Sequence, residues 1–438
     1  MRRSAHAVLA ALLTLVTSGC GPRYAARDTP QAGQRQVLTS EDDALLEDVS
    51  KRSFLFFWEH ADPSTGIVRD RARTGGAPVD GPGRDVGSIA AVGFGLTGLC
   101  IAAERNWVPR DQAIARARTT LRFFAERQPH ERGWFYHFVN IRTGAREWKS
   151  ELSSIDTALL LAGVLTVRQC FPHPEIVRLA DVIYRRVDFP WMLAGDSRLL
   201  SMGWKPESGF LASRWDHYCE LMILYLLAIG SPTHPLPAAS WTAWRRPVIT
   251  FDRYAYIGGP PPLFVHQYSH AWVDFRGWRD PAPARTDWFQ NSVDATRAHK
   301  TFCLTLSREF PGYRGDVWGI TASDSRKGYV AWGGPPRDPA IDGSVVPCAA
   351  AGSLMFAPDI TMPVVREMYR TFGARVYGRY GFADAFHPTE GWVNPDVIGI
   401  DLGITLLSAE NLRTGRVWDW FMRNPEVPSA MARAGLTR

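Results

Sequence analysis

Residues 213–227 read SRWDHYCELMILYLL, a stretch that begins with polar and charged side chains and ends in an unbroken apolar run. A helix that is apolar on all of its faces packs in the interior of a large domain. The pattern therefore predicts a helix over residues 211–229 that enters the core at Glu220. Other helices must surround this one to bury it.

Helical periodicity recurs on both sides of this stretch. A first helix is expected from Ser40, which precedes three acidic residues at the positive end of the helix dipole, to His60. The other predicted helices cover residues 87–105, 110–128, 152–171, 174–187, 263–274, 286–309, 341–356, 360–374, 401–412 and 414–423. The best strand-like alternation lies in Trp134–Ile141 and Val248–Ile257.

This order of elements indicates the fold class. Roughly a dozen helices in sequential pairs, without a strand–helix–strand rhythm, predict an all-α fold. We expect an (α/α)6 toroid of helical hairpins with long aromatic-rich loops and few short strands. No linker-like change in composition interrupts the chain after residue 40, so one catalytic domain is expected over residues 41–425, followed by a tail over residues 426–438.

The composition narrows the classes of function. The 438 residues are 45% hydrophobic and 21% charged, which excludes a disordered chain. The 17 Trp, 22 Phe and 13 Tyr have two explanations, a large aromatic core or surfaces that stack on a polyhydroxylated ligand. The net charge of +6 is spread without a block of Lys and Arg, which argues against binding to nucleic acid.

The N-terminus resembles a bacterial lipoprotein signal. Two arginines precede a short apolar run at residues 7–16, and residues 17–20 (TSGC) resemble a lipobox. We expect residues 1–19 to be a signal peptide, Cys20 to carry lipid and residues 20–40 to be a flexible tether, with ordinary signal cleavage as the alternative. The expected location is the periplasm, with the lipid in the outer membrane because Gly rather than Asp follows the cysteine.

The cysteines are widely scattered and form no CxxC motif. They are Cys20, Cys100, Cys170, Cys219, Cys303 and Cys348. Five remain if Cys20 carries lipid, and four of these lie in apolar helical contexts. Buried free thiols are therefore expected rather than a disulfide framework.

Two motifs match known site patterns only in part. Residues 93–98 (GFGLTG) fit G-x-G-x-x-G, but they lie inside an apolar helical run, so close helix packing explains them better than a nucleotide. His266 and His270 share a helix face as two metal ligands would, yet no third ligand has a recognisable spacing. Polar residues that line a cleft are the preferred interpretation of that stretch.

Carboxylates at the starts of helices are the best candidates for chemistry. Desolvation at the entry of an apolar helix raises the pKa of Glu220, as a general acid near neutral pH requires. Asp216 is expected on the same helix face, one turn earlier. The alternative is a buried Glu220 paired with an Arg or a His.

Two further acidic clusters also lie at helix starts. Asp156 completes a capping box with Ser153, whereas Glu151 has no such structural explanation and is the better catalytic candidate. Asp384 and Asp401 lie late in the chain, and helix capping is the alternative role for Asp401. Three acid-bearing helix starts around one aromatic cleft would suit glycoside cleavage, which needs one carboxylic acid and one carboxylate.

Several long motifs resemble the glucoamylase-like domain family, which includes glycoside hydrolase family 144 endo-β-1,2-glucanases and the terminal domain of cyclic β-1,2-glucan synthases. The motifs are ELSSIDTALLLAG (151–163), WDHYCELMILYLLAIGSPTHP (215–235), HQYSHAWVDFR (266–276), WGITASD (318–324), GSVVPCAAAGSLMFAP (343–358), YGFADAF (380–386) and IGIDLGITLLSAENLRTG (398–415). The resemblance covers about residues 45–425.

The resemblance implies inverting hydrolysis of β-1,2-glucan to sophoro-oligosaccharides, without a metal or organic cofactor. It assigns the general acid to Glu220 and favours Asp401 as the base, with Glu151 as the alternative, and it implies that the base can act through a chain of waters. It also implies that Glu151 and Asp156 lie in the glucose-binding cleft. The other residues expected to bind substrate are Asp216, Tyr218, His266, Gln267, Trp272, Asp274, Arg276, Trp318, Asp324 and Asp384. An exo-acting or transglycosylating enzyme and a non-catalytic glycan-binding lipoprotein remain the alternatives.

Overall fold

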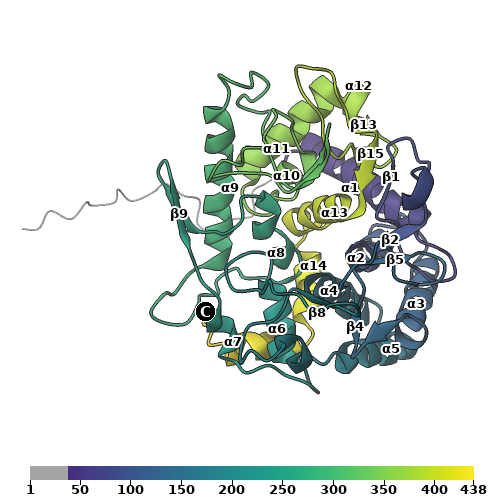
Figure 1. The fold of residues 1–438 in the computed structure, drawn as a ribbon. Coiled ribbons are helices and arrows are strands. Elements are labelled where there is room, and N and C mark those ends of the chain that lie inside the picture. The colour runs from purple at the N-terminus through teal and green to yellow at the C-terminus, as the bar shows by residue number, and fades with distance from the viewer. Residues whose placement is uncertain (1–37) are drawn as a thin grey trace, which may run out of the picture. The chain divides into compact units, whose positions relative to one another are not determined.

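The structure is a computed structural model that describes residues 38–438 (Figure 1). The predicted signal peptide and Cys20 lie outside the described residues. The described chain is mostly helical with a few short strands, as the sequence predicts.

Four helices form the centre of the core. They are α2 (Ile89–Glu104), α4 (Ser154–Cys170), α6 (Met222–Gly230) and α13 (Gly399–Arg413), and almost all of their residues are buried. α2 lies between α4 and α13 and packs extensively on both, while α6 packs on α4 (Figure 1). Because little of these helices meets water, apolar residues cover most of their faces rather than a single stripe.

The other helices cover this centre. Amphipathic α1 (Ser40–His60) packs on α2 and α13, α3 (Arg110–Glu126) packs on α2, and α5 (Pro174–Arg186) packs on α4. The remaining helical segments are η1 (Gly81–Gly83), η2 (Pro190–Leu193), α7 (Ser240–Ala243), η3 (Leu263–His266), α8 (Tyr268–Trp272), α9 (Trp288–Thr305), α10 (Pro347–Ala351), α11 (Pro358–Glu367), η4 (Met368–Phe372), α12 (Gly373–Val376), α14 (Arg416–Met422) and α15 (Glu426–Arg433).

The strands are short and antiparallel. The pairs are β1 (Arg71–Arg73) with β15 (Asp396–Ile398), β2 (Val86–Ser88) with β5 (Phe138–Asn140), β3 (His130–Glu131) with β4 (Trp134–Phe135), β9 (Val248–Phe251) with β10 (Tyr254–Ile257), β11 (Ser323–Ser325) with β12 (Gly328–Val330) and β13 (Tyr377–Gly378) with β14 (Gly381–Phe382). β6 (Leu152–Ser153), β7 (Gly203–Lys205) and β8 (Gly209–Phe210) form one three-stranded sheet. Of the two segments predicted as strands, Val248–Ile257 is the β9–β10 hairpin, and Trp134–Ile141 is divided at His137 into β4 and β5.

The glycines of residues 93–98 serve helix packing, as predicted. A Cβ added at Gly93 would lie 2.1 Å from the carbonyl oxygen of Leu159, and one at Gly163 would lie 2.1 Å from the carbonyl oxygen of Gly93. The backbones of α2 and α4 thus touch where both helices lack side chains, which is the function of small residues at such crossings.

The helix predicted over residues 211–229 is shorter than expected. It begins at Met222, because the backbone before it bonds to other segments: Trp215 N–H donates to the Leu200 carbonyl and Tyr218 N–H to the Arg245 carbonyl. The stretch predicted as one helix over residues 360–374 is divided into α11, η4 and α12, and only α10 forms within residues 341–356. Residues 426–433, expected in a tail, form α15 and pack on α6.

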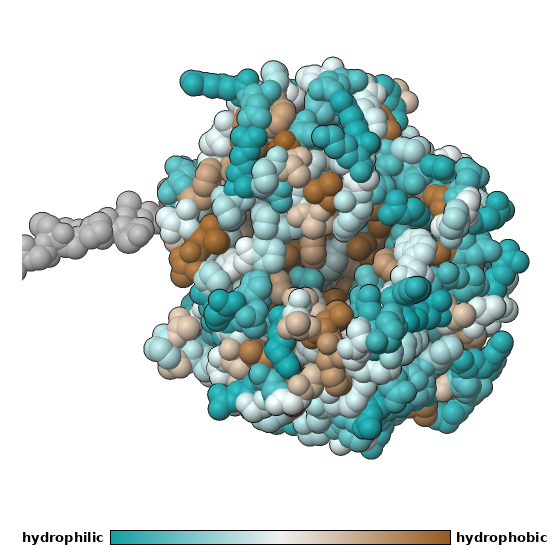
Figure 2. Space-filling view, viewed as in Figure 1, coloured by the Kyte–Doolittle hydropathy of each residue, from teal (hydrophilic) through white to brown (hydrophobic). Residues whose placement is uncertain are grey.

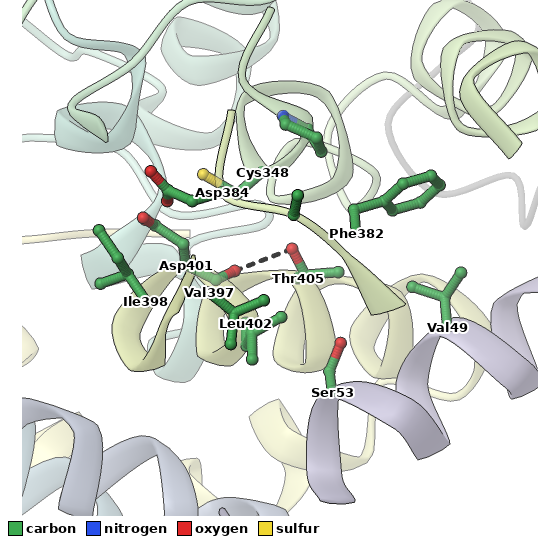
Figure 3. A pocket seen from close by; sticks show the side chains of 12 residues that line it. Val49, Ser53, Cys348, Phe382, Asp384, Val397, Ile398, Asp401, Leu402 and Thr405 are labelled. Carbon is green, nitrogen blue, oxygen red and sulfur yellow. Dashed lines mark hydrogen bonds between the residues drawn. The ribbon is translucent and has the colours of Figure 1, made fainter. Parts of the chain in front are cut away.

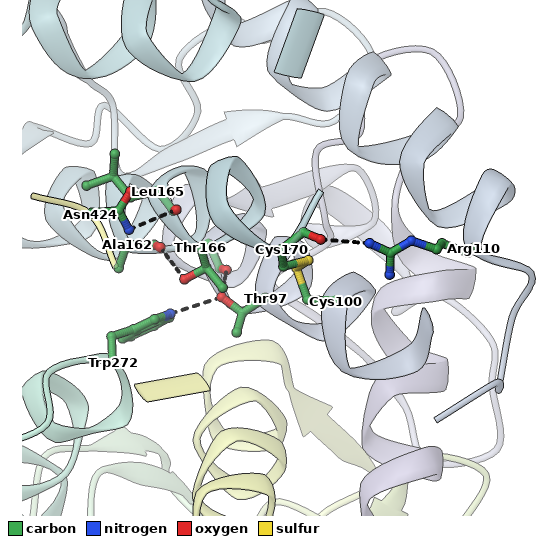
Figure 4. The surroundings of a disulfide bond; sticks show 10 residues. Thr97, Cys100, Arg110, Ala162, Leu165, Thr166, Cys170, Trp272 and Asn424 are labelled. Carbon is green, nitrogen blue, oxygen red and sulfur yellow. Dashed lines mark hydrogen bonds between the residues drawn. A yellow bond between two sulfur atoms is a disulfide. The ribbon is translucent and has the colours of Figure 1, made fainter. Parts of the chain in front are cut away.

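One cysteine prediction is wrong. Cys100 near the end of α2 and Cys170 at the end of α4 form a disulfide (Figure 4). They lie 70 residues apart, so only the packing of the two helices brings them together. The other described cysteines, Cys219, Cys303 and Cys348, are buried free thiols as expected.

Candidate active site

Carboxylates gather at the N-terminal ends of buried helices. Strands β6 and β15 lead directly into α4 and α13, and each helix carries an aspartate in its first turn, Asp156 and Asp401 respectively. The positive end of a helix dipole favours negative charge at these positions. The face in Figure 2 is hollowed between the regions that Figure 1 labels α2, α8 and α13.

Glu220 stands just before the first turn of α6. Ser269 of α8 fixes this entry, since its hydroxyl donates to the Glu220 carbonyl (2.6 Å) and accepts from Ile223 N–H (3.0 Å). Burial, together with the negative charge of Asp156, raises the pKa of the Glu220 carboxyl to about 7. A carboxylic acid that holds its proton near neutral pH can protonate a leaving group.

His137 lies between two acids of the site, Glu151 and Asp156. Its Nδ1 lies 3.2 Å from Glu151 Oε1, and its Nε2 lies 3.5 Å from Asp156 Oδ1. Burial opposes the positive charge of the ring, but the two carboxylates and Asp70 outweigh it, so the pKa of His137 is raised. The hydrogen bond from His137 is the main reason that the pKa of Glu151 is lowered, which keeps Glu151 ionised.

Asp401 and Asp384 face one another, with the Cys348 thiol beside them (Figure 3). Burial and the negative charge of Asp401 raise the pKa of Asp384 well above its ordinary value. Burial also raises the pKa of Asp401, to about 6, while hydrogen bonds from Asp384 and Cys348 limit that rise. Asp384 therefore keeps a proton and donates it in a hydrogen bond to an ionised Asp401.

A network of polar groups holds this pair in place. The Asp324 N–H donates to Asp384 Oδ2 (2.8 Å), and Asn394 Nδ2 donates to Asp324 Oδ2 (3.0 Å) and to Asp384 Oδ2 (3.3 Å). Arg71 bridges Asp324 (2.8 Å) and Asp70 (3.0 Å), so β1, β11 and the segment before β15 are tied together. These contacts fix the orientation of the acids before any substrate binds.

The acids near His137 and the acids near Asp401 belong to one site. The buried phenol of Tyr268 has a raised pKa, mainly because of burial, and both Asp401 and Glu220 contribute to that increase. His137, beside Glu151, senses the charge of Asp70, which is bound to Arg71. The structure thus brings together six of the predicted site residues: Glu220, Asp401, Glu151, Asp156, Asp324 and Asp384.

The other predicted site residues lie elsewhere. Five are buried in the core: Tyr218, His266, Gln267, Trp272 and Trp318. Their polar atoms mostly bind protein groups, for example Tyr218 to His266 (3.0 Å) and Trp272 to Thr97 (2.9 Å). The remaining three are more exposed and form ion pairs: Asp216 with Arg245 and His217, and Asp274 with Arg276. Asp216 does not share a helix face with Glu220, because the helix has not yet begun.

His266 and His270 are buried in the core rather than arranged as metal ligands. Burial lowers the pKa of both His266 and His270 to about 3, so both rings are neutral. His270 Nε2 lies 3.1 Å from the hydroxyl of Ser292. Among residues 38–438, no group of three or more His, Cys, Asp or Glu side chains could hold a metal ion.

Sequence reasoning missed several residues of the site, notably Asp70, Arg71, His137 and Tyr329. Tyr329 lies on the β11–β12 hairpin and is 54% exposed, yet burial and then the charges of Asp401 and Asp384 raise the pKa of its phenol. No local pattern marks these positions, since each of them lies in a loop or in a strand of three residues.

Known proteins match this chain over almost all of its described length. A sequence model of the family described as "Putative glucoamylase" matches residues 212–425. A solved structure from Bacteroides fragilis with the same description is 30% identical, covers 93% of this chain and 99% of its own, and has a TM-score of 0.82. The chain belongs to the glucoamylase-like family of glycoside hydrolases.

Two relatives of this glucoamylase-like domain have named activities. The structure of an endo-β-1,2-glucanase from Chitinophaga pinensis, in complex with sophorotriose and glucose, is 26% identical, covers 92% of this chain and 99% of its own, and has a TM-score of 0.84. An exo β-1,2-glucooligosaccharide sophorohydrolase from Parabacteroides distasonis is 27% identical over 90% of this chain. The glucoamylase-like domain described here spans only 58% of that relative's length.

Proposed function

We propose that this domain hydrolyses β-1,2-glucan to sophoro-oligosaccharides, with Glu220 as the general acid and Asp401 as the general base of an inverting reaction. One observation carries the proposal. The Glu220 carboxyl, with a pKa of about 7, shares a site with Asp401, which is ionised because the proton of the Asp384–Asp401 pair resides on Asp384. Two carboxyl groups in opposite protonation states are what glycoside hydrolysis needs.

Each group has a distinct step. Glu220 donates its proton to the glycosidic oxygen as the bond to the anomeric carbon breaks, and Asp401 accepts a proton from the attacking water, directly or through further waters. Glu151 is a weaker candidate for the base, because His137 already occupies its carboxylate at 3.2 Å. We assign Glu151, Asp156 and Asp324 to substrate binding.

The choice of β-1,2-glucan rests on the relatives. The Chitinophaga pinensis enzyme is an endo-β-1,2-glucanase, and the Parabacteroides distasonis enzyme is an exo-acting sophorohydrolase. We favour endo cleavage, since the first of these is matched over nearly its whole length. Exo action is the second candidate, and the named activity of the second relative favours it.

The sizes of the products separate these two modes. Endo cleavage of linear β-1,2-glucan by residues 21–438 is expected to give a mixture of short oligosaccharides and an early fall in mean chain length. Gel filtration with reducing-end counting measures both. Release of sophorose alone while the remaining polymer stays long would instead establish exo action.

The activity is expected to pass through a maximum between about pH 6 and pH 7. Asp401 must be ionised, so activity rises through its pKa of about 6, and Glu220 must be protonated, so activity falls through its pKa of about 7. Values of kcat/KM from pH 4.5 to pH 9 measure both limbs. A profile that stays flat from pH 6 to pH 9 would contradict the assignment of Glu220.

The fold and location are proposed in the same way. We propose that the buried helices and those that cover them form an (α/α)6 toroid, a choice that the family favours.

We also propose that the chain is exported and held in the outer membrane by lipid on Cys20. The Cys100–Cys170 disulfide supports export, because disulfides persist in oxidising compartments. None of the helices in residues 38–438 is long and apolar enough to cross a bilayer.

A further inference from the structure

Trp148 presents a large aromatic surface to solvent. It is 52% exposed, whereas most of the described tryptophans are buried. Its backbone φ is +53°, and that of the next residue, Lys149, is +49°. A bulky residue rarely adopts this left-handed conformation, and two such non-glycine residues in succession are strained. Strain of this kind persists only where the surroundings enforce it, and it gathers at binding sites.

Arg146 enforces the conformation of this loop. Its guanidinium donates to the carbonyl oxygens of Lys149 (2.6 Å) and Ser150 (2.5 Å). The same guanidinium forms a bidentate pair with Glu207, at 2.8 and 2.9 Å. The backbone that carries Trp148 is therefore held in place before any ligand arrives, which reduces the entropy lost on binding.

A row of contacting rings connects this indole to the active site. The Trp148 ring centroid lies 4.9 Å from that of Phe138, and the Phe138 ring is stacked on His137 at 3.8 Å. His137 in turn contacts Glu151 and Asp156. Trp148 is thus the outer end of a row of rings that begins at His137, beside Glu151.

We propose that Trp148 is a sugar-binding platform that stacks on a glucose residue of a β-1,2-linked chain at a position beyond Glu151. This inference rests on the proposed function. A flat indole suits the apolar C–H face of a pyranose ring. The platform engages only chains long enough to pass Glu151.

The test compares long and short substrates. Trp148→Ala is expected to lower kcat/KM on long linear β-1,2-glucan about tenfold, mainly through KM, because one stacking contact is lost. Its kcat/KM on the shortest oligosaccharide that the enzyme cleaves is expected to match the wild type. Trp148→Phe, which keeps a ring, should lie between the two. Tyr369→Ala is the matched control, since it removes an aromatic ring that is 45% exposed and packs on Tyr377.

Binding provides a second readout. In the Glu220→Gln background, calorimetry is expected to show about tenfold weaker binding of long glucan when Trp148 is also changed to Ala. Equal affinity with and without Trp148, or equal losses on long and short substrates, would overturn the platform while leaving the proposed function intact. If the wild type neither cleaves nor binds β-1,2-glucan, the proposed function fails and the assignment of a glucan to Trp148 fails with it.

Discussion

Glu220→Gln is expected to lower kcat on β-1,2-glucan by about 10²–10⁴-fold, because a glutamine cannot donate a proton to the leaving oxygen. The change preserves shape, and the backbone contacts of Ser269 that hold this turn do not involve the side chain. Binding of substrate should therefore persist. The initial rate of reducing-end release at saturating glucan measures the effect.

The same variant carries its own folding control. Burial raises the pKa of Glu220 from 4.5 to about 7, so the stability that its protonated form contributes is lost as the pH rises through that range. Glutamine removes this loss and should increase the free energy of unfolding above pH 7 by about 3 kcal/mol. Unchanged kcat would make Glu220 structural. Glu309→Gln, which removes an exposed partner of Arg337, should alter neither property.

Asp401→Asn is expected to lower kcat by about 10²–10⁴-fold, because the amide cannot accept a proton from the attacking water. The variant should fold, since the amide oxygen can still accept the hydrogen bond from protonated Asp384. Single-turnover rates on a short oligosaccharide measure the loss separately from product release.

Asp384→Asn is the matched control for that prediction. An asparagine resembles the protonated aspartic acid: its oxygen can accept from Asp324 N–H and Asn394, and its amide can donate to Asp401. This variant should keep far more activity than Asp401→Asn. If Asp384→Asn were inactive and Asp401→Asn active, the roles within the pair would be reversed.

Features that depend on one short segment of the chain can be predicted from the sequence. The change from polar to apolar residues at Glu220 correctly predicts a carboxyl whose pKa burial raises, although the helix begins two residues later. Ser153 also caps α4 as its motif predicts, because its hydroxyl accepts from Asp156 N–H at 3.2 Å. Both features depend on neighbours within a few residues, which a sequence displays directly.

Contacts between distant segments could not be predicted in this way. Arg71 binds Asp324 across 253 residues, and Cys100 pairs with Cys170 through the crossing of two helices. Tyr218, His266 and Trp272 were expected in the cleft because they lie in motifs rich in polar and aromatic residues. They are buried in the core instead, and most of their polar atoms bind other protein groups rather than solvent.

The most direct test of the central claim is the release of reducing ends from linear β-1,2-glucan, with β-1,3-, β-1,4- and α-1,4-glucans in parallel, by the wild type and by Glu220→Gln. We predict rapid release from β-1,2-glucan alone by the wild type, and almost none by the variant. Turnover of another glucan in preference to β-1,2-glucan, or equal turnover by the variant, would contradict the proposed substrate or the proposed acid respectively.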